Sequence, residues 1–76
     1  MSEVEFVDIF ADNLRDIMKE SGYSIAELAE ESKLDKSTIC RYLRKERMPT
    51  LKAVINLSIA LLCDIEDLIP TYDYID

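Results

Sequence analysis

Residues 24–43 read SIAELAEESKLDKSTICRYL, and this stretch decides the fold. Ser24 is a suitable N-cap, and Glu27 three residues later completes the capping-box pattern that opens a helix. Small and apolar residues follow at helical spacing until the segment Ser32-Lys33-Leu34, which interrupts the pattern. The first half of the stretch therefore predicts a short helix that ends at a break of about three residues.

The second half of the stretch predicts another short helix. Asp35 is a suitable N-cap, and its carboxylate also suits the positive end of the helix dipole. Ile39, Tyr42 and Leu43 then recur at helical spacing. Two short helices on either side of a break form the layout of a helix-turn-helix motif, here spanning residues 24–43.

Upstream of the motif, apolar residues recur at spacings of three and four and predict a helix that begins near Glu3. Ser2 and Glu5 repeat the capping-box pattern at its start, and Gly22, the one glycine of the chain, is suited to its C-terminal end. The inward face of this helix is expected to consist of Phe6, Phe10, Leu14, Ile17 and Met18.

Downstream of the motif, an irregular basic loop over residues 44–49 precedes two more predicted helices. Thr50 is a suitable N-cap for a helix over residues 51–62, which is apolar on most sides, as expected of a central core helix. Asp64 is a suitable N-cap for a last short helix over residues 64–69, which the following proline stops.

The fold class predicted from these elements is all-α, with five helices in one compact domain, residues 1–76, and a C-terminal tail at residues 70–76. A chain of 76 residues that is 49% hydrophobic and 33% charged has the composition of a folded domain rather than a disordered one. It has no apolar run of about 18 residues, so we expect no membrane span. The acidic start, Met1–Glu5, is unlike a signal peptide, and a cytoplasmic location is expected.

The two cysteines, Cys40 and Cys63, form no CxxC pair, which argues against a structural disulfide or a zinc site. Free thiols in a reducing compartment are the expected state. A redox switch at Cys40 is the alternative, because oxidation would add bulk to the second helix of the motif.

Charge is unevenly distributed along the chain. The whole chain carries −7, yet residues 33–47 hold six basic and two acidic residues, a net charge of +4 that leaves −11 for the remainder. A local basic cluster matters more for phosphate contact than the charge of the whole chain. The cluster is read as a DNA-contacting surface, and a merely solvated charged loop is the alternative.

An enzymatic function finds little support in the composition. The chain has no histidine, one glycine, no phosphate-cradling loop and no evident pair of catalytic carboxylates. We expect no cofactor, no metal and no small-molecule ligand, because a domain this small has little room for a cleft.

At this point the sequence resembles a known family. The pattern SxAELAEESxLDKSTICRYLRKxRxP, followed by LxxxINLSIALLCDIEDLI, is similar to the lambda-repressor-like helix-turn-helix domain, also called Cro/C1-type or XRE. The resemblance covers roughly residues 10–69. It implies a lambda-repressor-like fold, in which helices 2 and 3 form the motif, and a prokaryotic or phage transcriptional regulator that binds double-stranded DNA in a sequence-specific manner.

The resemblance also implies roles for individual residues. The third helix with the residues after it, 35–45, would be the recognition helix that enters the major groove. Base edges would be contacted by Lys36, Ser37 and Arg41. Phosphates would be contacted by Thr38, Arg44, Lys45 and Arg47. The core of the motif would be formed by Ala29, Leu34, Ile39 and Tyr42.

Three positions depart from the family pattern. Ile25 stands where the family often has glutamine, so it would act as a hydrophobic staple or contact a sugar or a methyl group. Lys33 stands where glycine is usual, and a left-handed backbone there would cost about 1 kcal/mol unless the turn differs. Leu43 stands at an often polar position and would mark extra packing or a partner surface.

Members of such a family commonly bind near-palindromic operators as homodimers. The dimer contacts are predicted on the last helix and the tail, at Ile65, Leu68, Ile69, Tyr72 and Tyr74. For the two tyrosines a frayed tail is the alternative. For the whole chain the alternative function is a protein-interaction module on the same scaffold, with weak DNA binding or none.

Overall fold

The computed structural model describes residues 2–69 and contains five helices over that range, with no strand among them. The helices are α1 (Glu3–Ser21), α2 (Ile25–Ser32), α3 (Lys36–Leu43), α4 (Leu51–Leu61) and α5 (Ile65–Leu68). The predicted all-α architecture with five helices is confirmed, and α5 is shorter at both ends than the predicted range 64–69.

Local capping explains where α1 begins and ends. The Oγ of Ser2 accepts a hydrogen bond from the backbone N–H of Glu5 at 3.2 Å. The carboxylate of Glu5 accepts from the Ser2 hydroxyl rather than from its backbone N–H, so the predicted reciprocal capping box is only half formed. Gly22 ends the helix in the left-handed conformation, with φ 74°, as the sequence predicted.

The later helices are capped in similar ways. The Oγ1 of Thr50 accepts from the N–H of Ala53 at 3.0 Å and opens α4. The backbone N–H of Asp64 donates to the carboxylate of Asp67 at 3.0 Å and opens α5. Both predicted N-cap positions are therefore confirmed.

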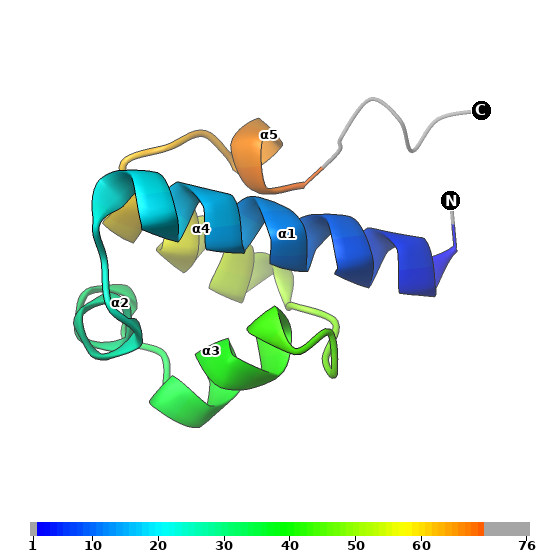
Figure 1. Cartoon of the computed structure of the whole chain (residues 1–76), viewed down its shortest axis with the longest axis horizontal. Helices are drawn as coiled ribbons and strands as arrows, with labels where there is room; N and C mark the ends of the chain where they lie inside the picture. The colour runs from blue at the N-terminus through cyan, green and yellow to red at the C-terminus, as the bar shows by residue number, and fades with distance from the viewer. Residues whose placement is uncertain (1, 70–76) are drawn as a thin grey trace.

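The helix α1 runs along the long axis of the molecule, with α3 on one side of it, α5 on another and α4 behind it (Figure 1). The helix α2 packs on α3 and α4, and α5 packs on α1 and α4. Asn13 fastens α5 to α1, because its Nδ2 donates to the carbonyl of Leu68 at 3.0 Å.

One hydrophobic core joins all five helices. Phe10 of α1 and Tyr42 of α3 meet edge to face, with ring centroids 5.5 Å apart and an interplanar angle of 79°. Phe6 packs against the core but is only half-buried. The buried core consists of Phe10, Leu14, Met18, Leu28, Ile39, Tyr42, Ala53, Val54, Leu57, Ala60, Leu61 and Leu68.

The helix α4 is less central than the sequence predicted. Its buried residues lie on one face, whereas Leu51, Ile55 and Ile59 of the same helix remain exposed. The helix α4 thus supplies five of the twelve core residues of the described range, as predicted of a core helix, but its other face is apolar and exposed.

Candidate nucleic-acid interface

The helix α3 separates its core residues from its polar ones. Ile39 and Tyr42 are buried, and burial raises the pKa of the Tyr42 phenol. Lys36, Ser37 and Arg41, the three residues predicted to contact bases, are all exposed on the helix. The buried residues hold α3 against the core, and the exposed side chains on its other face remain free to donate hydrogen bonds to base edges.

The turn before α3 fixes the angle between the two helices of the motif. Lys33 adopts a left-handed backbone, φ 64° and ψ 25°, a conformation that favours glycine. The two predicted motif residues Ala29 and Leu34 are half-buried and pack against the core. Asp35 occupies the N-cap position of α3 as predicted, but its side chain makes no capping hydrogen bond.

At the start of α2 the predicted capping box is complete. Ser24 Oγ accepts from the N–H of Glu27, and the carboxylate of Glu27 accepts from the N–H of Ser24, both at 3.1 Å. The bond from the Ser24 backbone lowers the pKa of Glu27 below its ordinary value of 4.5. Ile25 is half-buried against the core beside this cap, so its side chain serves as packing.

The basic loop after α3 is folded back by its own backbone. The N–H of Lys45 donates to the carbonyl of Tyr42 at 3.1 Å, and the N–H of Glu46 donates to that of Arg41 at 2.9 Å. Lys45 takes a left-handed conformation there, with φ 65°. The side chains of Arg44, Lys45 and Arg47, predicted to contact phosphates, are exposed, and the fourth such residue, Thr38, is half-buried.

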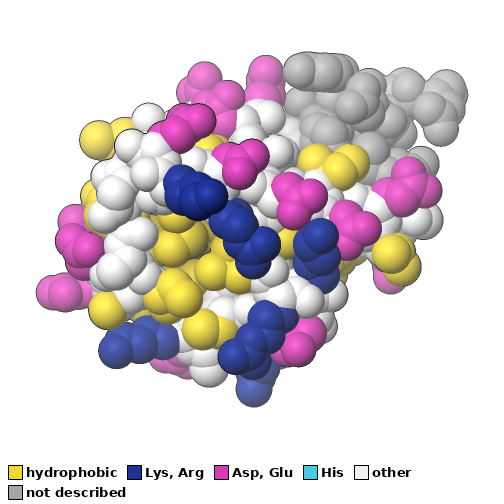
Figure 2. Space-filling model, viewed as in Figure 1, with side chains coloured by type: hydrophobic (Ala, Val, Ile, Leu, Met, Phe, Trp, Pro, Cys, Tyr) yellow, Lys and Arg dark blue, Asp and Glu magenta, His cyan; other side chains and the backbone are white. Residues whose placement is uncertain are grey.

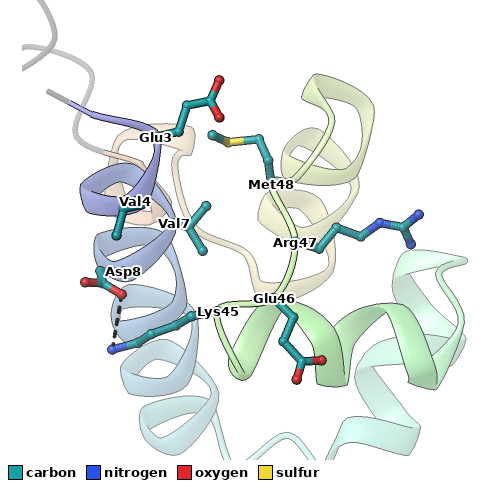
Figure 3. Close-up of a pocket in the computed structure, with 8 residues that line it drawn as sticks. All are labelled: Glu3, Val4, Val7, Asp8, Lys45, Glu46, Arg47 and Met48. Atoms are coloured by element: carbon teal, nitrogen blue, oxygen red, sulfur yellow. Dashed lines mark ion pairs between the residues drawn. The ribbon is translucent and has the colours of Figure 1, made fainter.

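Lys45 does not stand free in this loop. Its Nζ lies 3.4 Å from Asp12 Oδ1 and 3.6 Å from Asp8 Oδ1, both on α1. Figure 3 shows Lys45 and Asp8 pointing toward one another across the start of α1, whereas Arg47 points away. The groove at this place has a volume of about 220 Å³ and an apolar part formed by Val4, Val7 and Met48.

Two basic residues on α1 were not predicted as site residues. Arg15 and Lys19 border a groove of about 300 Å³, which is otherwise lined by Met18, Tyr23, Ser24, Ile25 and Leu43. The Nη2 of Arg15 donates to the carbonyl of Leu43 at 2.9 Å, so its guanidinium lies at the C-terminal end of α3, where a cation is favoured. Their signal in the sequence is their spacing of four residues, which puts the only basic residues of α1 on one face.

The basic loop and the end of α3 both lie against α1, where Lys45 pairs with Asp8 and Asp12 and Arg15 reaches the carbonyl of Leu43. Figure 2 shows Lys and Arg side chains spread across the near face, around a patch of hydrophobic side chains, with Asp and Glu mostly nearer its margins. A cationic face with apolar contacts between its charges is a surface suited to a polyanion.

The predicted dimer contacts on α5 pack against the core of the same protomer instead of standing exposed on its surface. Leu68 is fully buried in the core of its own protomer, so its side chain offers no surface to a partner. Ile65 and Ile69 are half-buried and pack against the same core. Tyr72 and Tyr74 lie outside the described residues.

Other kinds of site are not found in the described range. Over residues 2–69, no group of three or more metal-binding side chains occurs, and no helix is long and apolar enough to cross a membrane. Cys40 and Cys63 are free and half-buried. Burial, together with Asp67 and Asp64, raises the pKa of the Cys63 thiol.

Comparisons with known proteins give a coherent result. The helix-turn-helix family HTH_3 matches residues 14–68. The crystal structure of the restriction-modification controller protein C.AhdI from Aeromonas hydrophila is similar with a TM-score of 0.78 and 29% identity, over 82% of this chain and 94% of that chain. Among curated protein sequences, no match was found.

Two further solved structures agree in fold. An HTH_3 family transcriptional regulator from Vibrio cholerae has a TM-score of 0.85 and 21% identity over 88% of this chain, which spans 38% of that regulator's length. The hypothetical transcription factor NHTF from Neisseria has a TM-score of 0.80 and 24% identity, over 97% of this chain and 87% of that one. The family match covers most of the chain, and the protein therefore belongs to the HTH_3 family of helix-turn-helix proteins, the Cro/C1-type or XRE family of DNA-binding regulators.

Proposed function

We propose that this DNA-binding regulator reads its operator with α3 in the major groove, as a homodimer on a near-palindromic site in the cytoplasm. Lys36, Ser37 and Arg41 contact base edges in this proposal. Backbone phosphates are contacted by Thr38, Arg44, Lys45 and Arg47, and by the newly located Arg15 and Lys19. Two half-sites would lie about 34 Å apart, one turn of the duplex.

One observation carries the proposal: in a protein with a net charge of −7, α3 exposes Lys36 and Arg41 while Ile39 and Tyr42 are buried, and the loop after it exposes Arg44, Lys45 and Arg47. Residues 33–47 carry a net charge of +4 against −11 for the rest of the chain, so this segment attracts phosphates most strongly. The similarity to the controller protein from Aeromonas hydrophila, which covers 82% of this chain and 94% of that chain, also supports the proposal.

The first experiment measures binding to random-sequence duplex DNA at several salt concentrations. The logarithm of the association constant should fall linearly with the logarithm of salt concentration, with a slope of about −0.9 per phosphate contacted. A folded protein that does not bind at low salt would contradict DNA binding and favour the interaction-module alternative.

A pair of variants separates base reading from phosphate contact. After selection of bound sites from a random duplex library, Arg41→Ala should relax the preference at one base position, with a loss of about 1–3 kcal/mol of discrimination. Arg44→Ala should weaken binding to all DNA sequences alike and reduce the magnitude of the slope of affinity against salt concentration by about 1. If Arg44→Ala alters the preference and Arg41→Ala does not, the proposed register of α3 on the duplex is wrong.

A further inference from the structure

The outer face of α4 carries a stripe of exposed aliphatic side chains. We define the α4 stripe as Leu51, Ile55, Ile59 and Leu62, which are 70%, 37%, 67% and 91% exposed. Their spacings of four, four and three residues place them on one side of a helix with 3.6 residues per turn. Aliphatic side chains are ordinarily exposed one at a time, whereas an aligned set marks an interaction surface.

The α4 stripe is also the part of the helix that the protomer leaves uncovered. The opposite face of α4 packs against α2, α1 and α5 through Ala53, Val54 and Leu57, among others. Only one charged residue, Lys52, occurs from residue 51 to residue 63. The stripe is therefore an apolar strip with one charged neighbour, Lys52, on a chain that carries 16 acidic and 9 basic residues.

The charge of the chain indicates which partner would cover the α4 stripe. Two copies of a chain with a net charge of −7 repel one another, and the acidic surfaces of α1, α2 and α5 make that repulsion local. The α4 stripe is the place where a second copy approaches without bringing carboxylates together. A different protein would be expected to use the acidic surfaces as well, through basic residues of its own.

The spacing of the stripe fits an identical partner. Along the sequence, Ile55 and Ile59 are the middle residues of the stripe and Leu51 and Leu62 are its two ends. The four positions are nearly symmetric about position 57. An antiparallel copy of α4 on a two-fold axis near Leu57 brings Leu51 opposite the partner's Leu62. The same axis brings Ile55 opposite the partner's Ile59. A self-complementary patch of this kind is what an isologous interface requires.

We propose that the α4 stripe is the self-association surface of this protein, occupied by the same stripe of a second copy. The proposal deepens the proposed function and takes from it only that two copies act on one duplex. It moves the dimer contacts from α5, where Leu68 is buried, to α4. The helix α4 lies behind α1 in Figure 1.

The test is the oligomeric state of the full chain without DNA, measured by sedimentation velocity over a roughly hundredfold range of protein concentration. The wild type should show a reversible monomer–dimer equilibrium. Ile59→Glu should raise the dimer dissociation constant at least about 100-fold, because a two-fold interface buries the new carboxylate twice. Ile59 is 67% exposed in the protomer, so the helical circular dichroism spectrum should be unchanged.

A second variant guards against loss of folding. Leu62 adopts a left-handed backbone, with φ 55°, which glycine takes without strain, so Leu62→Gly should weaken the dimer about tenfold or more while stabilising the monomer. The matched control is Val4→Glu, which adds the same charge at an aliphatic side chain that is 73% exposed on α1, away from the stripe. Its dimer dissociation constant should equal that of the wild type.

The outcomes are distinct. A wild type that stays monomeric at all concentrations overturns the proposal, as does a dimer that Ile59→Glu leaves intact or that Val4→Glu dissociates equally. Random-sequence duplex binding by the wild type is measured in parallel. A dimer that loses its association with Ile59→Glu but does not bind DNA contradicts the proposed function and leaves the interface standing.

Discussion

Lys33 holds the turn between α2 and α3 in a conformation that glycine favours. With φ 64° and ψ 25°, its Cβ approaches the neighbouring backbone, and this crowding costs about 1 kcal/mol at a non-glycine residue. The Asp35 side chain, two residues later, makes no capping hydrogen bond. Part of the free energy of unfolding is therefore lost at this one residue.

Replacing Lys33 with glycine should recover the free energy of unfolding that the left-handed backbone costs. We expect Lys33→Gly to be more stable than Lys33→Ala by about 1 kcal/mol, because both remove the charge and only glycine relieves the left-handed backbone. For a domain of this size the difference corresponds to a shift of about 4–8 °C in Tm. Urea unfolding of the two variants measures it directly.

Glu30, which is exposed within α2, is the control position. There the order should invert, with Glu30→Gly less stable than Glu30→Ala by about 1 kcal/mol, since glycine is a poor residue in a helix. Equal stabilities of the two Lys33 variants would mean that the turn carries no strain.

Backbone strain of this kind is only partly readable from sequence. The position of Lys33 was identified because the family turn usually has glycine there. Lys45 and Leu62 also have positive φ values, and neither was predicted. Leu62 is the C-cap of α4, and Lys45 follows the C-cap of α3. Both make their turn through backbone hydrogen bonds, which any residue type can form.

At the scale of helices, the N-cap positions of α2 and α3 were both predicted, but their side chains behave differently in the structure. Ser24 forms a complete capping box with Glu27, whereas the Asp35 side chain makes no capping bond. We expect Ser24→Ala to lower the free energy of unfolding by about 1 kcal/mol. Asp35→Ala should lower it by about 0.3 kcal/mol, from the helix dipole alone.

Chemical denaturation of the two variants at neutral pH gives both values. The comparison is matched, since each variant removes one N-cap side chain from an eight-residue helix of the same motif. Similar losses for the two variants would indicate that Asp35 caps α3 in solution after all.

The existence of the helices follows from local rules and was predicted correctly, because caps, glycine and proline act within a few residues. Which face of a helix is covered depends on distant partners. The apolar residues of α4 satisfy the pattern of a core helix equally well on two faces, and only the packing of α2, α1 and α5 decides that Ile59 is outside. For the same reason Leu68 of α5 was taken as a surface residue although it completes the core.

At the scale of the molecule, the interface depends on charges brought together from distant segments. The exposure of Lys36, Ser37 and Arg41 on α3 follows from helical spacing, which sequence reveals. The proximity of Arg15 to the end of α3 spans 28 residues of sequence and needs the tertiary fold. The same is true of Lys45, whose ion-pair partners Asp8 and Asp12 lie on α1.

The ion pairs of Lys45 set the last prediction. Asp8 and Asp12 hold its Nζ within 3.6 Å and 3.4 Å, at side chains that are 39–60% exposed, so each pair is weak on its own. They nevertheless compete with phosphate for Lys45 and place two carboxylates beside the basic loop. Asp8→Asn with Asp12→Asn should therefore tighten binding to random duplex DNA by about tenfold at low salt and steepen the salt slope by about 1.

The control for this pair is Asp16→Asn with Glu20→Gln, which changes the net charge equally but lies on the groove that α1 forms with α4 and α5. It should leave the salt slope unchanged, because those carboxylates are not near the basic loop.

A third comparison isolates Lys45 itself: Lys45→Ala should weaken DNA binding more in the Asp8→Asn, Asp12→Asn background than in the wild type. Equal losses in the two backgrounds would mean that the ion pairs do not restrain Lys45, and that the acidic helix α1 weakens DNA binding only through its overall charge.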